Sequence, residues 1–206
     1  MFLALEWGES LADSPPWARM MAAVFESVAA RSGGFTTVDL AQAANATLIF
    51  FIGIMMVGGA SGSSAGGIRL ATAGVVDAAI AATIRGQEHP QVFRRRNPTE
   101  LVFRAMTVIA HFLVAFGAAT TLLALTEEFF GKGELDFIAL MFETVSALAT
   151  DGLSTEFTPG LSDAGKLVLI VTMFLGRVGP LTAAYALQQR AGSVRYRYAE
   201  SAVRIG

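Results

Sequence analysis

Two short glycine-containing segments have the residue types best suited to cation coordination. The first is Ser32-Gly33-Gly34-Phe35 and the second is Ala149-Thr150-Asp151-Gly152. Because glycine tolerates backbone dihedrals that other residues avoid, such a segment can turn a row of backbone carbonyls toward one point. Carbonyl rows replace the hydration shell of a cation in selectivity filters. For either segment alone, an ordinary turn between two helices would explain the glycines equally well.

An internal repeat favours the filter interpretation over the turn. Phe25-Glu26-Ser27-Val28 matches Phe142-Glu143-Thr144-Val145 at an offset of 117 residues. At an offset of 118, three further positions match, namely Gly34, Met55 and Gly58 with Gly152, Met173 and Gly176. The spacing from the first to the last glycine of each set is 24 residues in both units. A duplication of this kind predicts two related structural units, each with one filter segment at the same position.

Composition indicates a membrane protein. Of the 206 residues, 53% are hydrophobic and only 16% are charged, whereas a soluble domain has about 25% charged residues. The 15 lysines and arginines do not exceed the 17 acidic residues, so we expect no nucleic-acid partner. Without cysteine the chain has no disulfide or thiolate chemistry, and His89 and His111 are too few for a histidine-rich metal site.

Three apolar stretches are long enough to cross about 30 Å of hydrocarbon at about 1.5 Å per residue. They run from Leu40 to Ile68, from Ala105 to Thr126 and from Leu161 to Gln189. We therefore expect an all-α membrane protein in which the first two stretches are spanning candidates, whereas the third is long enough but is interrupted at its middle by Arg177.

Two shorter apolar stretches, Pro15 to Ala30 and Asp136 to Ala149, are predicted to form half-helices that lead into the two filter segments. The C-terminal end of such a helix dipole favours a cation. Each half-helix carries one glutamate, Glu26 or Glu143, which we expect to hydrogen-bond behind the filter.

The predicted organisation is two repeats and a tail. Residues 1–97 form the first unit, which lacks most of its leading membrane helix, residues 98–189 form the second, and residues 190–206 form a tail. Arginines gather in residues 85–104 and in the tail, whereas the loops near residues 127–136 and 154–166 are acidic. By the positive-inside rule, loop 85–104 and the tail are expected to be cytoplasmic.

A glycine-rich loop, residues 58–67, interrupts the apolar stretch of the first unit and is a candidate gate. It contains Gly59-Ala60-Ser61-Gly62-Ser63-Ser64-Ala65-Gly66-Gly67. Irregular backbone at membrane depth is tolerated only when buried in protein or lining a cavity; close packing through small residues is the alternative. Arg177 matches Gly59 by the repeat, so we expect it to face the loop, unless it snorkels to the cytoplasmic surface.

These motifs resemble those of the TrkH/KtrB (Trk/Ktr/HKT) potassium transporter family. Arg31 to Asp39, together with Gly58 to Arg69, resembles the third pore repeat of that family. Phe142 to Ser154, together with Phe174 to Thr182, resembles the fourth. The arginine- and tyrosine-rich tail looks more like the Ktr branch. Asp151 departs from the pattern because an apolar residue is commoner there, and Ser63 and Arg69 replace the usual proline and lysine.

The resemblance implies a potassium uptake pore, of which this chain is the C-terminal half. It implies tandem membrane helix, pore helix, filter loop and membrane helix repeats of the potassium-channel type. Filter glycines would be Gly34 and Gly152, with K⁺ bound by backbone carbonyls, and the gate would be loop 59–67 with Arg177. It further implies a multi-pass protein of the plasma membrane, a homodimer, a cytosolic nucleotide-binding regulatory ring like TrkA or KtrA, no covalent cofactor, and Na⁺ as a candidate coupling ion.

Two other hypotheses fit parts of the sequence. A two-repeat cation channel subunit could dimerise into a complete pore. An intramembrane serine protease is suggested by the Gly-x-Ser-Gly pattern at residues 59–62, with Ser61 as nucleophile and His111 as base. The protease hypothesis explains neither the repeat nor the half-helices nor Arg177.

Overall fold

The computed structural model is built of helices. It describes residues 2–6, 15–60, 63, 65–86, 91–92, 95–96, 99–131 and 136–190. For residues 91–92, 95–96, 99 and 179–190 the description covers the backbone alone. In chain order the helices and 3-10 turns are α1 (Phe2–Leu5), α2 (Pro16–Ala29), η1 (Leu40–Gln42), α3 (Asn45–Met56), α4 (Leu70–Ile84), α5 (Thr99–Phe130), α6 (Phe137–Ala149), η2 (Thr158–Gly160) and α7 (Asp163–Arg190). Two-residue strands β1 (Gln91–Val92) and β2 (Arg95–Arg96) pair antiparallel between α4 and α5.

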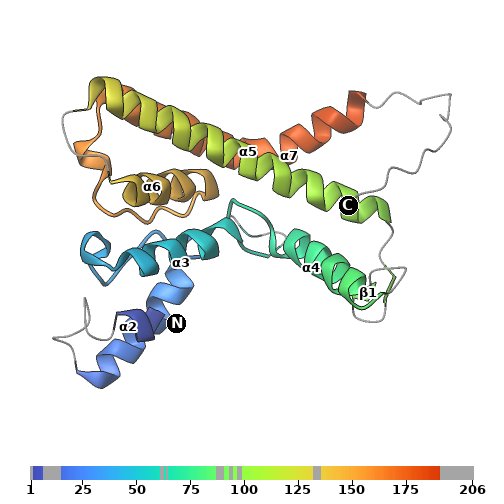
Figure 1. The fold of residues 1–206 in the computed structure, drawn as a ribbon, viewed down its shortest axis with the longest axis horizontal. Helices are drawn as coiled ribbons and strands as arrows, with labels where there is room; N and C mark the ends of the chain where they lie inside the picture. Colours follow the sequence, from blue (N-terminus) through green and yellow to red (C-terminus); the bar gives the residue numbers. More distant parts are fainter. Residues whose placement is uncertain are drawn as a thin grey trace.

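The longest helix, α5, runs along the molecule and defines its length (Figure 1). Among the described residues, it supplies the one segment, Glu100–Phe130, that is long and apolar enough to cross a membrane. Helix α7, which was expected from Leu161, begins at Asp163 and packs against α5. Helix α6 lies alongside only part of α5, as expected for a half-helix (Figure 1).

Both predicted half-helices form. Helix α6 begins after Asp136, whose carboxylate accepts hydrogen bonds from the backbone of Ile138 and Ala139 at its N-terminus. Helix α2 begins at Pro16 rather than Pro15, which is the N-cap and supplies no side-chain bond. Proline suits the first turn because its missing N–H is not needed there.

The apolar stretch from residue 40 to residue 68 contains a short helix followed by the glycine-rich loop, and not one continuous helix. Helix α3 covers only 12 residues within it and ends where Val57 adopts extended backbone. The glycine-rich loop then leads into α4, which continues in the same general direction (Figure 1). As predicted from the glycine content, the described part of residues 58–67 is not helical.

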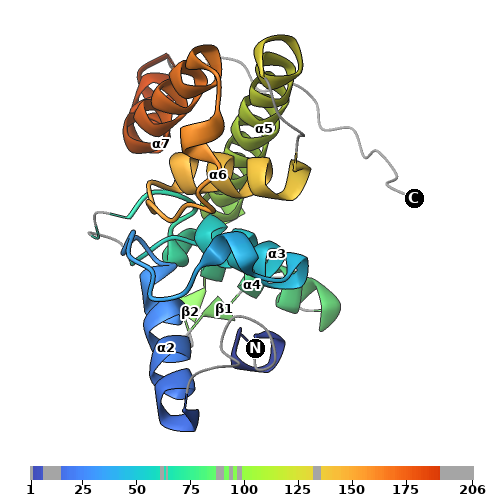
Figure 2. The same cartoon turned by 90° about the vertical axis from the view of Figure 1, so that its left-hand side faces the viewer.

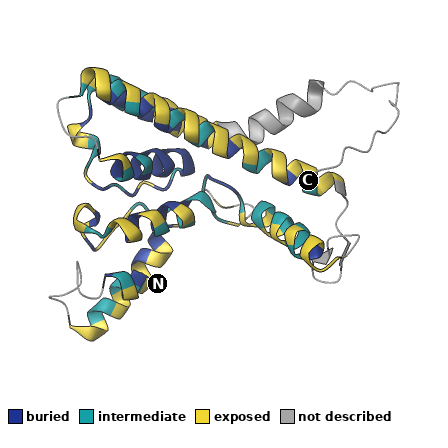
Figure 3. Ribbon diagram, in the orientation of Figure 1, coloured by how far each residue is buried: buried dark blue, intermediate teal, exposed yellow. Residues whose placement is uncertain are grey.

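Helix α6 occupies the centre of the structure. It lies between α3 and α7 (Figure 2) and is buried almost throughout (Figure 3). Phe142 and Val145 of α6 pack in one apolar cluster with Phe51 and Met55 of α3. A second cluster joins Leu140 of α6 to α5 and α7. The predicted filter segment that follows α6 is therefore held by both repeats.

Each unit has one buried glutamate that holds the start of a helix, α3 in the first unit and α7 in the second. Glu127 of α5 accepts hydrogen bonds from the Ser162 backbone N–H, at 3.1 Å, and from the Ser162 hydroxyl, at 2.7 Å, next to the N-terminus of α7. Glu6, which follows α1, accepts a 3.1 Å bond from the backbone N–H of Ala44, the N-cap of α3. A carboxylate beside a helix N-terminus is favoured by unpaired N–H groups and by the dipole. The sequence comparison missed this pair.

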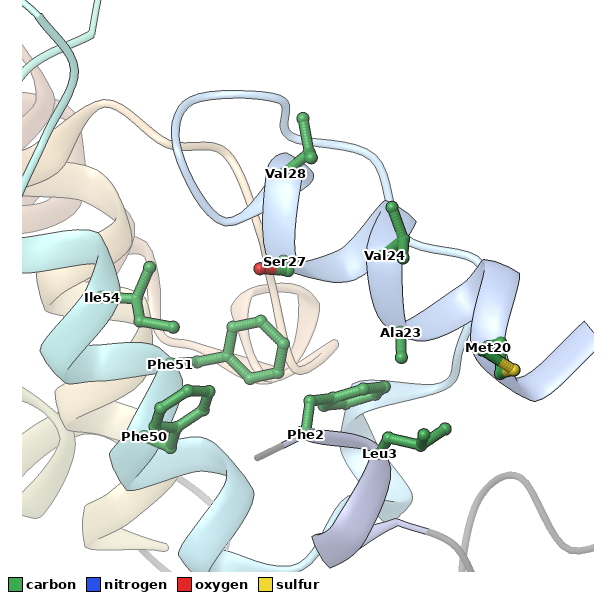
Figure 4. Close-up of a pocket in the computed structure, with 10 residues that line it drawn as sticks. All are labelled: Phe2, Leu3, Met20, Ala23, Val24, Ser27, Val28, Phe50, Phe51 and Ile54. Atoms are coloured by element: carbon green, nitrogen blue, oxygen red, sulfur yellow. The ribbon is translucent and has the colours of Figure 1, made fainter.

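An apolar groove is lined by residues of α1, α2 and α3. It has a volume of about 360 Å³, and Figure 4 shows Phe2, Met20 and Phe51 among the side chains on its walls. Helix α2 also exposes Trp17, Met21 and other large apolar side chains on its outer side. Helix α2, the predicted half-helix of the first unit, is therefore much less enclosed than α6.

We predict that Glu127→Ala lowers the free energy of unfolding by about 1–3 kcal/mol, because it leaves the Ser162 N–H and hydroxyl without their acceptor. Thermal unfolding of the detergent-solubilised protein checks this. Glu128→Ala is the control, since Glu128 is the exposed neighbour on the same helix; its effect should stay within about 0.5 kcal/mol. Equal melting temperatures for the two variants would contradict the capping role.

Candidate ion-binding site

The two predicted filter segments lie against each other, although they are 118 residues apart in the sequence. A Cβ atom added to Gly34 would lie 3.0 Å from the backbone oxygen of Asp151, and one added to Gly152 would lie 3.2 Å from the Cα of Gly34. Both glycines have positive φ, +67° and +95°. The close backbone contact and the positive φ together require glycine at both positions.

The backbone follows a related path in both segments. Ser32 and Thr150, which match at the offset of 118, both have positive φ, +86° and +54°. For residues with a side chain this conformation costs about 1–3 kcal/mol and is concentrated at functional sites. Thr150 ends α6 in the left-handed region, and its N–H bonds back to Ala147.

Glu26 and Glu143 brace the segments from behind, as predicted. Glu26 accepts the backbone N–H of Thr37 at 2.7 Å and the hydroxyls of Thr36 and Thr37. Glu143 accepts the backbone N–H of Thr155 at 2.9 Å. Thr37 and Thr155 each lie three residues after their filter glycine. Each of the helices α2 and α6 therefore holds the chain that follows its own predicted filter segment.

Glu143 makes more bonds than its counterpart. It also accepts from the hydroxyls of Ser154 and Thr158, at 2.5 Å and 2.7 Å. Oε2 of Glu26 is buried and has no hydrogen-bond partner among the described residues. The second unit thus braces its filter segment with the fuller network.

Backbone hydrogen bonds join the two ends of the glycine-rich loop. The N–H of Gly58 donates to the Ile68 oxygen and the N–H of Ile68 donates to the Met56 oxygen, both at 2.9 Å. A Cβ on Gly58 would lie 1.9 Å from the Gly66 oxygen, so the two sides of the loop touch directly. Residues that enter and leave the loop are thereby fixed together.

The loop contacts the end of α6 directly before the second filter segment. The N–H of Gly66 donates to the Thr150 hydroxyl at 3.1 Å. A Cβ on Gly66 would lie 2.6 Å from the Ala149 oxygen. Ser63 and Ala65 bond within the loop. The remaining predicted gate residues Ser61, Gly62 and Ser64 lie outside the described residues.

Arg177 lies on α7 with an exposed side chain. Its neighbour Gly176 packs on the same end of α6, since a Cβ there would lie 2.1 Å from the Leu148 oxygen. The helix end therefore meets α7 on one side and the loop on another. The backbone next to the predicted gating arginine and the glycine-rich loop thus both lie at the C-terminal end of α6. The expected contact between the Arg177 side chain and the loop stays a prediction.

Ser146 is a site residue that sequence reasoning missed. Its backbone oxygen accepts the N–H of Asp151 at 3.0 Å, and its hydroxyl accepts the N–H of Gly152 at 3.2 Å. A serine three residues before the last residue of a helix is common in sequences. Only the left-handed turn at Thr150 reveals that it anchors the filter segment.

The fold is all-α, and comparison with known proteins shows that the chain belongs to a class of membrane transport proteins. The family model TrkH, described as "Cation transport protein", matches residues 1–192. Ktr system potassium uptake protein B of Vibrio alginolyticus is 37% identical over 186 residues, which are 90% of this chain and 39% of that protein. Ktr system potassium uptake protein D of Bacillus subtilis (strain 168) is 35% identical over 184 residues, 89% of this chain and 39% of that protein.

Two further similarities extend the comparison. Potassium/sodium uptake protein NtpJ of Enterococcus hirae is 34% identical and covers 91% of this chain and 42% of that protein. The solved potassium transporter TrkH from Vibrio parahaemolyticus is similar in fold, with a TM-score of 0.66 at 20% identity, over 90% of this chain and 40% of that chain. The chain thus spans about two fifths of the length of these relatives.

The chain belongs to the TrkH cation transport protein family. This is a family of membrane cation transporters and not of enzymes, so the serine protease hypothesis is set aside. The resemblance to the Trk and Ktr proteins noted from the filter motifs is confirmed.

Proposed function

We propose that this chain forms part of the pore of a potassium uptake system in the plasma membrane. The observation that carries the proposal is the meeting of Gly34 and Gly152, two glycines of positive φ from two related units. Relatives at 34–37% identity are named potassium uptake or potassium/sodium uptake proteins. Backbone carbonyls of residues 32–35 and 149–152 would replace the hydration shell of K⁺.

The glycine-rich loop and Arg177 form the proposed gate. The two ends of the loop are joined by backbone hydrogen bonds, and in the described part of the loop Gly66 donates a hydrogen bond to Thr150 of the second filter segment. Glycine-rich backbone changes conformation at low steric cost. The proposed role of Arg177 is electrostatic: its cationic side chain on α7, beside the pore, would repel cations and so add to the barrier.

The proposed assembly follows the resemblance. The pore-forming protein would be a homodimer in lipid, bound to a cytosolic nucleotide-binding regulatory ring. Loop 85–104 and the tail from residue 190 would face the cytoplasm, where an arginine-rich segment is favoured. Because one relative is named a potassium/sodium uptake protein, Na⁺ is the proposed candidate for a coupling ion.

We predict that Gly34→Ser and Gly152→Ser each reduce the preference for K⁺ over Na⁺ by about tenfold or more, because a side chain there strains a positive φ and enters the neighbouring segment. The measurement is rubidium uptake, with K⁺ or Na⁺ as competitor, in a potassium-uptake-deficient bacterium. The chain is expressed alone and together with any coding sequence that precedes it.

Gly117→Ser on α5 is the control, because a Cβ there meets nothing within 4 Å. Unchanged selectivity in both filter variants would count against the proposal. Uptake by the chain expressed alone would favour a pore built from two copies of it.

We predict that Arg177→Ala, or a shortened loop 59–67, raises rubidium flux at equal protein in the membrane, because each removes part of the barrier. Selectivity should stay as in the parent protein, since the filter segments are unchanged. Arg104→Ala is the control; this exposed arginine pairs with Glu100 on the same helix. Equal or lower flux in well-folded Arg177 and loop variants would defeat the gate proposal.

A further inference from the structure

Asp151 links the two predicted filter segments through its side chain. Its Oδ1 accepts the backbone N–H of Ser32, which belongs to the other unit. Its own backbone N–H is bonded to the Ser146 oxygen of α6 at 3.0 Å. One residue therefore connects the second pore helix to the backbone of the first filter segment.

The carboxylate of Asp151 has no counterpart in the first unit. By the offset of 118, Asp151 corresponds to Gly33 in the first unit, which has no side chain to reach back. A Cβ at Gly33 would lie 2.8 Å from the Cα of Ala29, so a larger residue does not fit there. The hydroxyl of Ser32 adds a longer 3.3 Å bond to the Thr150 oxygen. The carboxylate of Asp151 is thus the main acceptor that joins the two segments.

The carboxylate lies where a charged hydrogen bond is strong. Asp151 is 6% exposed, and its Oδ2 is buried with no hydrogen-bond partner in the described part of the chain. Bonds from N–H groups to a carboxylate are about twice as strong as neutral ones, and shielding from water strengthens them. Ser32, which donates this bond, has the unfavourable φ of +86°. The bond helps to hold a backbone conformation that serine alone disfavours.

We propose that Asp151 is a specificity-determining residue, whose carboxylate fixes the first filter segment to the second and so keeps their carbonyl rows at a spacing that suits K⁺. This inference rests on the potassium uptake proposed above. Selectivity depends on the size of the carbonyl cage and on the number and field of its ligands. Loss of the link lets the Ser32 backbone relax, and the cage then adapts to the smaller Na⁺.

The test compares three variants of the transporter in the membrane of the potassium-uptake-deficient bacterium. Asp151→Val removes the acceptor, Asp151→Asn keeps an acceptor oxygen but removes the charge, and Asp163→Asn removes a charge from an exposed position at the start of α7. Rubidium uptake is measured against K⁺ and Na⁺ as competitors. The ratio of the two half-inhibiting concentrations reports selectivity, which a merely structural role would not change.

We expect Asp151→Val to lower the K⁺ preference about tenfold, the size of one charged hydrogen bond. Asp151→Asn should give a smaller loss of about threefold, because its amide oxygen keeps a hydrogen bond of about half that strength. Asp163→Asn should stay within about twofold of the parent. A parent-like ratio in Asp151→Val would overturn the inference. An equal loss in Asp151→Asn would also overturn it, because the charge and not the link would then set selectivity. A parent protein without rubidium uptake would instead defeat the proposed function.

A second measurement applies if Asp151→Val gives no uptake. The purified transporter is heated in K⁺ or in Na⁺, and the difference between the two melting temperatures is recorded. We expect the parent and Asp151→Asn to be stabilised more by K⁺, and Asp151→Val to lose that difference. A difference that persists in Asp151→Val would overturn the inference.

Discussion

The structure depends on buried carboxylates that satisfy backbone N–H groups outside regular helices. Irregular backbone is costly in a membrane unless its polar groups find partners within the protein. Glu26 and Glu143 bind the segments that return from the filters, whereas Glu6 and Glu127 hold the starts of α3 and α7. Removing one of these acceptors would leave buried donors unpaired, at a cost larger than the net gain of an ordinary hydrogen bond. The positions of the filter segments follow from these contacts.

The end of α6 is where the proposed filter and gate meet. Gly176 of α7 and Gly66 of the loop both approach its last carbonyls, and Gly66 also bonds to Thr150. Glycine allows both close approaches because any Cβ would overlap backbone atoms. A change in the loop would thus act directly on the residue that begins the second filter turn. In the proposed pore, gate and filter share a contact and need no long pathway between them.

Much of the arrangement could be predicted from the repeat. The repeat has two glycines at matching positions, and each follows a short apolar stretch with one glutamate. This pattern predicted the two half-helices and the bracing role of Glu26 and Glu143. The Glu6 and Glu127 pair was missed because its offset is 121, which a comparison at 117 and 118 does not align. The glycines of residues 58–67 predicted the break in the stretch from residue 40 to residue 68, but apolar length alone does not reveal that the helix before it has only 12 residues. The bond from Ser32 to Asp151 depends on tertiary contact and has no sequence signal.

The central claim is that the carbonyls of the two segments coordinate one ion together. Anomalous diffraction from crystals of the complete transporter grown in rubidium salt tests it most directly, because rubidium substitutes for potassium and scatters anomalously. The account predicts a peak within coordination distance of backbone oxygens from both the Gly34 and the Gly152 segments. Peaks only at side-chain carboxylates, or none between the two ordered segments, would contradict it.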